Sequence, residues 1–313
     1  MAVITTVTNV KPMREDLADM IYDVSPEDVP FLSGLKHESV DNTIFEWQTD
    51  ALVAVSATTA AEGADPTPAA ATDTVRLQNR TSIISKAAQT SGTHEAVNNA
   101  GMSKQMAYQI IRRAKECKRD TEHQIVGNHA PYSGTTTRIS ASYAAYTNDQ
   151  STVGATAGAV AAGTGADIPT GGDARALTET LLGAVIDNLY LAGGHPNIIM
   201  AHPTQKRKIT GFSGNANNGT TSRVTHDNSD KRVINAVSVY VSDYGDLKVL
   251  PNRFGLADEV LVYEQDMWSL GVLRPMSTKP LAKTGDSETR MVVQECAVKC
   301  KNPDASGAIF DLS

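Results

Sequence analysis

The chain has 313 residues, a formal net charge of −7 and three cysteines. It is long enough for more than one packed unit, since a single core stops growing at about 250–300 residues. The acidic balance excludes an overall field that grips a polyanion, and three cysteines exclude a disulfide framework, so we expect a reducing compartment. Because the sequence shows neither a secretory leader pattern nor a membrane-length apolar run, we expect a soluble chain made in a cytoplasm.

An arm and a hairpin are the first elements expected in chain order. A short helix is predicted over Arg14–Tyr22, and Phe31 is among the hydrophobic residues that should anchor the far end of the arm. Near-alternating polarity then predicts a strand over Thr43–Asp50, with Arg76–Ile84 as its partner. The Ala- and Thr-rich stretch Val55–Thr74 joins them and can bury little apolar area, so we expect a projecting hairpin. The alternative, a disordered surface loop without a role, stays open.

The longest predicted element is a helix over Ser103–Val126, which at 1.5 Å per residue is roughly 36 Å long. Its charged face places Arg112 one turn from Glu116 and Lys118 one turn from Glu122, a spacing suited to pairing, and we expect this face to contact solvent or another molecule. The opposite face should be buried because small or apolar residues recur there at three- and four-residue spacing. These residues are Met106, Ala107, Ile110, Ile111, Ala114, Cys117, Thr121 and Ile125.

A second unit is predicted in the C-terminal half of the chain. Residues 130–172 read as a loop with fragments of structure, in which Tyr132, Tyr143 and Tyr146 are the large apolar side chains. Asp173 is then expected to cap a helix that ends before Gly193. The remaining elements are a strand at Asn197–Ala201, a helix at Pro203–Ile209, a polar loop at Phe212–Asp230, strands at Ala236–Asp243, Leu247–Pro251, Glu259–Gln265, Trp268–Leu273 and Arg290–Lys301, and a hydrophobic tail at Ile309–Leu312.

The sequence contains no recognisable catalytic or metal-binding motif. His94-Glu95 begins like a zinc protease motif, but Asn98 stands where the second histidine ligand belongs. Cys296 and Cys300 are about 13 Å apart along a strand, too far to share one ion. Phosphate-binding loops, nucleophile elbows and dinucleotide fingerprints are missing as well. We therefore expect no enzyme, no metal and no cofactor; a binding or hydrolytic protein with a site built from scattered residues remains an alternative.

Several stretches together resemble one family of phage major head proteins. They are Ser25–Leu32, Phe45–Asp50, Glu62–Asp65, Lys118–Asp120, Val249–Phe254, Leu273–Pro275, Pro280–Asp286 and Gly307–Leu312. With the long helix and the projecting hairpin, they make the chain similar to the major capsid proteins of tailed double-stranded DNA bacteriophages, which have the Hong Kong 97-type (Johnson) fold. The match covers nearly the whole chain and is weakest in residues 130–172.

The resemblance implies an α+β fold in four parts. An N-terminal arm would occupy residues 1–36 and an extended hairpin loop residues 37–85. A peripheral domain with a long spine helix would comprise residues 86–128 and 272–313, and an axial domain residues 129–271.

The function implied is that of a structural major capsid protein in the virion. It would assemble in the cytoplasm of a host bacterium as hexamers and pentamers into an icosahedral head. That head would enclose double-stranded DNA without reading its sequence, and scaffold, portal and decoration proteins are further candidate partners. Membranes are not. A bacterial nanocompartment shell of the encapsulin type, enclosing a cargo enzyme, is the alternative within the same fold.

Residues of the hairpin, the spine helix and the C-terminal strands are the candidates for contacts between subunits. The alternative is that the charged ones are simply solvated, since exposed ion pairs contribute at most about 1 kcal/mol. The candidates are Phe45, Glu46, Trp47, Glu62, Arg112, Arg113, Lys118, Arg119, Arg274, Lys283 and Arg290.

Overall fold

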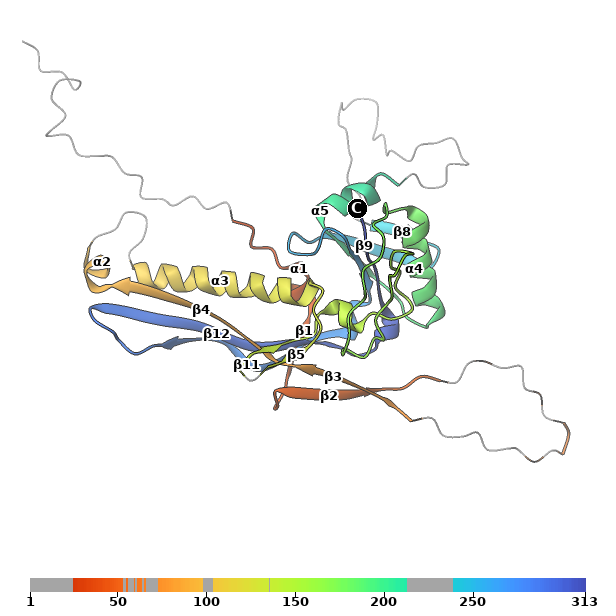
Figure 1. Cartoon of the computed structure of the whole chain (residues 1–313), viewed down its shortest axis with the longest axis horizontal. Coiled ribbons are helices and arrows are strands. Elements are labelled where there is room, and N and C mark those ends of the chain that lie inside the picture. Colours follow the sequence, from red (N-terminus) through yellow and green to blue (C-terminus); the bar gives the residue numbers. More distant parts are fainter. Residues whose placement is uncertain are drawn as a thin grey trace, which may run out of the picture.

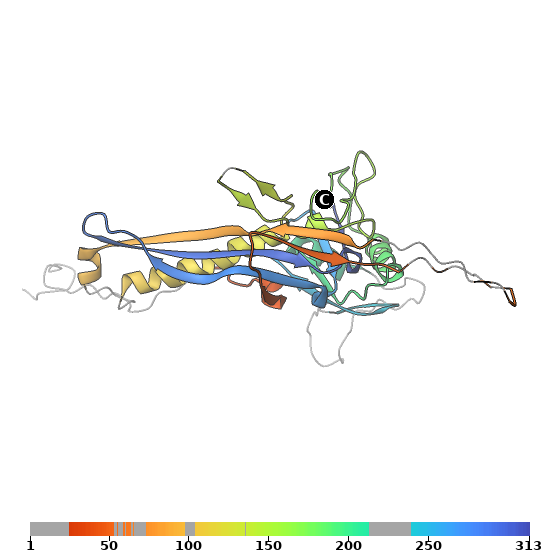
Figure 2. The same cartoon turned by 90° about the horizontal axis from the view of Figure 1, so that it is seen from below.

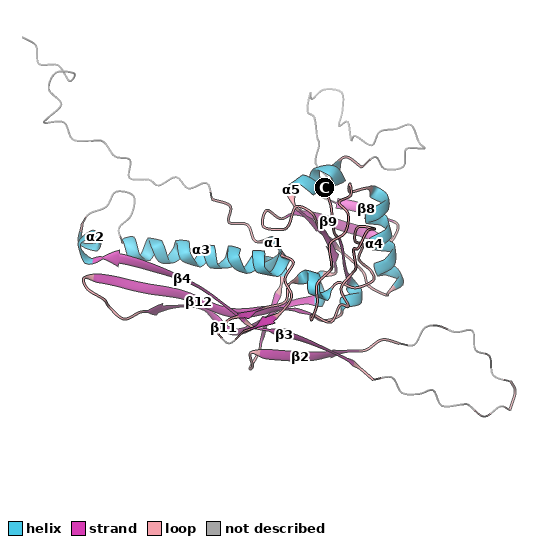
Figure 3. Ribbon diagram, viewed as in Figure 1, coloured by secondary structure: helices cyan, strands magenta, loops and turns pink. Residues whose placement is uncertain are grey.

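The computed structural model describes residues 25–52, 73–97, 104–134, 136–212 and 239–313, together with residues 55, 59, 61–63 and 65. Helices and strands occur in both halves of the described chain, which makes the fold α+β (Figure 3). The predicted helix at Arg14–Tyr22 lies outside the described residues, as does most of the predicted loop at Phe212–Asp230.

A long four-stranded sheet forms one end of the molecule (Figure 1). Its order is β1 (Lys36–Ser39), β11 (Trp268–Pro280), β12 (Ser287–Cys300) and β4 (Ser82–Ser91). The strand β1 runs parallel to β11, and the other neighbours are antiparallel. The strand predicted at Trp268–Leu273 therefore continues to Pro280, because pairing with β12 carries it past two irregularities in the register.

The long helix α3 (Gln105–Val126) packs along β4 and β12 and confirms the predicted spine. Its buried side includes Cys117 and Ile125, as the spacing predicted. Three expectations for this helix were wrong: Ala107 is exposed, Ile111 is 58% exposed, and Glu122 is completely buried. Apolar spacing alone could not locate the edges of the stripe, because these depend on how the sheet curves beneath the helix.

A five-stranded sheet forms the second unit. Its order is β13 (Ser306–Ile309), β10 (Val260–Tyr263), β7 (Ile198–Ala201), β9 (Gly245–Pro251) and β8 (Val239–Ser242). The helices α4 (Glu179–Leu191) and α5 (Pro203–Thr210) cover one face, where Ile199 and Val262 join their core. Thr178 caps α4 by accepting a hydrogen bond from the amide of Leu181, so the prediction that Asp173 caps this helix was wrong.

The other face of the five-stranded sheet meets an aromatic cluster that joins the two units. Residues 130–172 are loop with short fragments of structure, as predicted, and one of these fragments, the 3-10 helix at Tyr143–Tyr146, supplies Tyr143 and Tyr146, which are both 0% exposed. The ring of Tyr143 stacks on Trp268 with 4.6 Å between centroids. Phe31 packs edge-on against both rings from α1 (Pro30–Gly34). Aromatic packing therefore fixes how the arm, the long sheet and the second unit meet.

The predicted hairpin is confirmed as an antiparallel pair, β2 (Ile44–Thr49) and β3 (Val75–Arg80). The predicted partner strand Arg76–Ile84 was too long, because β3 ends at Arg80 and Ser82 already belongs to β4 of the long sheet. It lies on the side of the long sheet opposite α3 and extends beyond the body of the molecule (Figures 1 and 2). The remaining short elements are α2 (Gly92–Ala96), the paired strands β5 (Tyr132–Ser133) and β6 (Arg138–Ile139), and 3-10 turns at Gln265–Met267 and Pro303–Ala305.

Candidate assembly surfaces

The root of the hairpin is docked on the body of the molecule through aromatic side chains. Phe45 stacks on Trp47 with 5.5 Å between centroids, and Trp47 in turn lies 5.9 Å from the ring of Tyr146. Phe45 also covers Gly271 of β11, where an added Cβ would come within 3.1 Å of the ring. The Lys299 ammonium sits 5.8 Å from the Trp47 ring centroid, in cation–π range. Phe45 and Trp47 therefore hold the hairpin at its base within one subunit.

A buried carboxylate stands at the hinge where β3 passes into β4. Thr81, 0% exposed, donates its hydroxyl to Glu295 Oε1 at 3.0 Å. Arg274 binds the same carboxylate at 2.7 Å from Nε to Oε2, and Arg138 forms an ion pair with Oε1. Burial alone would raise the pKa of Glu295, but these hydrogen bonds and the two positive charges outweigh it and lower the pKa. Glu295 thus links the hinge, β11 and β6.

The outer part of the hairpin is exposed to solvent. Glu46 forms a 3.4 Å ion pair with Arg76 across the two strands, and both side chains are largely exposed. Leu52 and Val55 are 99% and 103% exposed, although both are apolar. Glu62 is exposed in a turn beside a glycine with a φ of +80°. The described residues of the tip therefore offer apolar surface that the subunit itself does not cover.

The spine helix presents cations in different states of pairing. Glu116 forms a 2.6 Å ion pair with Arg113 and not with Arg112, the neighbouring residue that the spacing had indicated as its partner. Arg112 is exposed and lies 5.8 Å from the ring of Tyr108. Lys118 is also exposed and does not pair with Glu122, although the spacing had indicated this pair, because Glu122 turns inward. Arg112 and Arg119 line a shallow cleft beside Ser25–Glu27.

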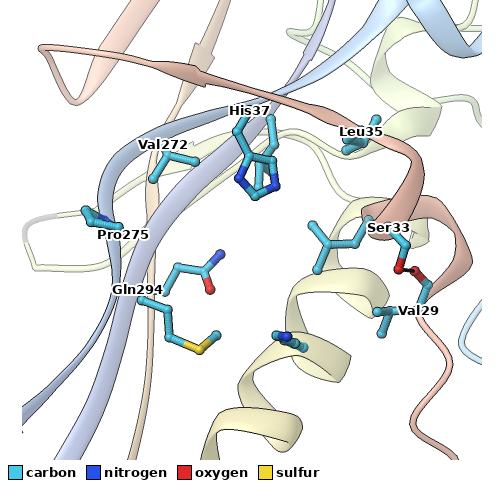
Figure 4. Close-up of a pocket in the computed structure, with 11 residues that line it drawn as sticks. Val29, Ser33, Leu35, His37, Val272, Pro275 and Gln294 are labelled. Carbon is cyan, nitrogen blue, oxygen red and sulfur yellow. Dashed lines mark hydrogen bonds between the residues drawn. The ribbon is translucent and has the colours of Figure 1, made fainter.

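Lys118 lies at the rim of a mainly apolar cavity of about 290 Å³ between α1, α3 and the long sheet. Leu32 and Leu35 line it on one side, and Val272 on the other. Figure 4 shows His37 and Gln294 pointing toward this space. Ser33, His37, Lys118 and Gln294 are its polar lining residues, and the other seven lining residues are apolar.

The candidate contact residues in the C-terminal strands also differ in whether they form an ion pair within the subunit. Arg274 is engaged by Glu295, and Arg290 forms a 2.6 Å ion pair with Glu288. Lys283 is exposed in the turn between β11 and β12. Within the described part of the chain, an ion pair is formed by Glu46, Arg113, Arg274 and Arg290 but not by Glu62, Arg112, Lys118, Arg119 and Lys283.

The described residues contain no group of three His, Cys, Asp or Glu side chains placed to hold a metal ion. In the same part of the chain, a helix long and apolar enough to span a membrane does not occur.

The proteins that are similar in sequence along most of the chain are phage major capsid proteins. The family model described as SU10 major capsid protein matches residues 2–313. The chain belongs to the SU10 major capsid protein family. The major capsid protein of Escherichia phage Phieco32 is 29% identical over 331 aligned residues, covering 94% of this chain and 92% of that protein.

Solved structures show the same fold at low sequence identity. The capsid asymmetric unit of cyanophage A-1(L) has a TM-score of 0.67 at 11% identity and covers 99% of both chains. The encapsulin SrpI of Synechococcus elongatus PCC 7942 has a TM-score of 0.57 at 8% identity, covering 100% of this chain and 97% of that one. The encapsulin is thus a distant relative in fold. The SU10-type chain has the Hong Kong 97-type fold and is a structural protein of the virion, a major capsid protein that self-assembles into the icosahedral shell of a tailed phage.

One buried contact within this SU10-type subunit, made by Glu122, could not be predicted from the sequence. Glu122 accepts hydrogen bonds from the amides of Phe31 at 2.9 Å and Leu32 at 2.7 Å, and from Asn252 Nδ2 at 2.6 Å. It therefore caps α1, whose own N-cap residue Val29 offers no side-chain acceptor. Burial raises the pKa of Glu122, although the three hydrogen bonds act in the opposite direction. A glutamate among many charges on a helix carries no sequence signal for this role.

Proposed function

We propose that the chain builds its shell as hexamers and pentamers in which the hairpin tip of each subunit lies over a neighbouring subunit. One observation carries this proposal: the root of the hairpin is docked by Phe45 and Trp47, whereas Leu52 and Val55 beyond it are fully exposed. Exposing two apolar side chains at the end of a projecting element is costly unless another surface covers them. In a self-assembling shell, another copy is the available surface.

The proposed domain division follows from this arrangement. The arm occupies residues 1–36 and the extended loop residues 37–85. The peripheral domain takes residues 86–128 and 272–313, and the axial domain residues 129–271. Ser306–Ile309 is the one exception within the range 272–313: because β13 pairs with β10, we assign this strand to the axial domain.

The candidate contacts are ranked by what they do within one subunit. Lys118, Arg112, Arg119, Lys283 and Glu62 form no ion pair within the described residues and are the first choice for pairing between subunits. Arg113, Arg274, Arg290 and Glu46 already have an acidic or basic partner, and Phe45 and Trp47 are packed at the hairpin root. We give this second group a supporting role.

The contents and partners of the shell are also part of the proposal. A chain with a net charge of −7 is suited to enclosing double-stranded DNA without holding it tightly or reading its sequence. Assembly would take place in the cytoplasm of the host bacterium, with scaffold, portal and decoration proteins as further partners. The role is structural, and no catalysis is proposed.

Deletion of residues 57–68 tests the hairpin contact. The shortened chain should keep the circular dichroism spectrum of the parent, because the root residues remain, but should not form heads in cells that express the phage head genes. A chain with Val97→Ser, a change at an exposed residue distant from the hairpin, is the matched control and should assemble normally. Normal heads from the deletion variant would refute the proposal. Particles that contain protein cargo instead of DNA would favour the nanocompartment alternative.

A further inference from the structure

The axial part of the chain has an exposed surface that combines aromatic and acidic side chains. At the end of α4, Tyr190 is 44% exposed and Leu191 is 82% exposed. Tyr190 stacks on Tyr244, in the turn between β8 and β9, with 4.2 Å between centroids. The exposed Asp187 and Asp243 lie beside this pair, and their negative charges raise the pKa of Tyr244. We call Asp187, Tyr190, Leu191, Asp243 and Tyr244 the α4–β8 surface.

The strand next to this surface is an open edge of the five-stranded sheet. β8 is hydrogen-bonded to β9 on one side, and within the described residues no strand pairs with its other side. Two of its side chains, Val239 and Val241, are apolar and are 48% and 73% exposed. Natural proteins usually protect such edges with charge, proline or a covering element. An apolar open edge beside an aromatic pair is therefore suited to contact with another protein surface.

A basic surface lies at a different flank of the same unit. The helix α5 carries Lys206, Arg207 and Lys208 in succession, and Arg207 is the exposed one of the three. The Lys206 ammonium donates to the carbonyl of Val249 at 3.2 Å, and that of Lys208 donates to the carbonyl oxygen of Ser313. The exposed Arg253 belongs to the loop that packs on α5 through the 2.7 Å hydrogen bond from Gln205 Nε2 to the carbonyl of Ala257. Arg207 forms no ion pair within the described residues. In Figure 1, α5 lies on the flank toward the spine helix, and α4 lies on the flank away from it.

The two surfaces complement each other in charge and are carried by the same chain. Rings of five or six identical subunits require head-to-tail contacts, in which two different surfaces of one chain meet. We propose that the α4–β8 surface of each copy docks on the α5 surface of the next copy around each ring. This inference rests on the proposed hexamers and pentamers and names the surfaces that join them. The acidic side chains set the register against α5, and the tyrosine pair and Leu191 supply the apolar contact.

Cross-linking within heads tests which surfaces meet. Heads are prepared with Tyr244→Cys and Arg207→Cys in the same chain and are treated with a short bis-maleimide. Cys117, Cys296 and Cys300 are buried and should not react before denaturation. The expected product is a ladder of linked chains that ends at about six, the largest closed ring proposed.

Two matched controls make the result specific. Each single cysteine variant should give no linked chains, because like surfaces do not meet in a head-to-tail ring. The pair Val97→Cys with Arg207→Cys should give no ladder, since Val97 is comparably exposed but belongs to the far end of the long sheet. Intact heads that yield only unlinked chains from the Tyr244→Cys and Arg207→Cys pair would overturn the inference while leaving the proposed function intact. The inference would also be overturned if the cysteine in the Tyr244→Cys variant did not react with maleimide in the unassembled chain. A segment of the same chain would then cover the α4–β8 surface in place of a neighbouring copy.

A charge exchange tests the electrostatic part. Asp187→Lys alone and Arg207→Glu alone should each lower the yield of heads about tenfold or more, because like charges placed across an interface are strongly unfavourable. The double variant should recover most of that loss. If its yield were no better than the product of the two single losses, with all three chains folded by circular dichroism, the two residues would not face each other.

Discussion

The cap that Glu122 places on α1 leads to the sharpest prediction about the subunit. Its two carboxylate oxygens receive three hydrogen bonds: Oε1 from Phe31 and Asn252, and Oε2 from Leu32. In Glu122→Gln one of these oxygens becomes an NH₂ group, which cannot accept. At least one buried N–H then loses its acceptor, which costs about 1–3 kcal/mol.

We expect Glu122→Gln to destabilise the attachment of α1 and not the whole subunit, because the hydrogen bonds of Glu122 hold α1 in place. Burial raises the pKa of Glu122, so part of the loss is offset when the charge is removed. A net destabilisation of about 2 kcal/mol corresponds to a roughly 30-fold larger population of the detached α1. Phe31 would leave the aromatic cluster in that state.

Amide hydrogen exchange measures this detachment directly. A peptide covering residues 25–35 should exchange roughly 30-fold faster in Glu122→Gln than in the parent chain. Glu116→Gln is the control, since Glu116 lies on the same helix in a partly exposed pair with Arg113 and should change exchange in α1 very little. Unchanged protection of residues 25–35 in Glu122→Gln would show that the cap does not hold α1 in place.

Three further outcomes are expected from buried groups. Tyr143→Phe removes a hydroxyl that lies 2.9 Å from one buried carbonyl oxygen and 3.1 Å from another, so thermal or denaturant unfolding should show a loss of about 1–2 kcal/mol; no loss would mean that ring packing alone matters. The lowered pKa of Glu295 means that its stabilisation is complete above the unfolded-state pKa of about 4.3 and disappears as the pH falls through the folded-state pKa. Glu295→Gln should therefore be less stable than the parent at pH 7 and approach it below about pH 4; a gap that stays constant with pH would contradict this. Burial raises the pKa of Cys296 to about 11 and that of Cys300 further, so a thiol reagent at pH 8 should modify neither before unfolding, and rapid labelling would contradict their burial.

The hinge at Thr81 illustrates why an ion-pair network can matter to an assembly protein even when its net contribution to stability is modest. Arg138 and Arg274 are 30% and 43% exposed, whereas the Glu295 side chain is 4% exposed. Burying the Glu295 carboxylate costs solvation, which offsets much of its attraction to the two half-exposed arginines. The network therefore adds little to the free energy of unfolding, but it fixes the positions of the strands that carry these residues. Its position between β3 and β4 places that geometry where the hairpin leaves the long sheet.

Periodic and local patterns in the sequence were sufficient to predict the individual helices and strands. The three- and four-residue spacing between Met106 and Ile125 predicted α3, and alternation with an intervening low-complexity stretch predicted the β2–β3 hairpin. Proline at the start of α5 and the short apolar run before it located β7 and α5. Such signals are readable because hydrogen bonding and side-chain direction within one element depend on neighbours a few residues away.

Tertiary structure alone decided the contacts that join distant segments. Glu122 meets Phe31 across 91 positions, and Glu295 meets Thr81 across 214, so neither partner could be recognised from spacing. Tyr143 reads as a tyrosine in a small-residue loop, yet it forms the centre of the molecule because Trp268 and Phe31 arrive there from other parts of the chain. A side chain becomes core, cap or surface according to what the fold brings against it, and this information lies in the packing of remote segments and not in local pattern.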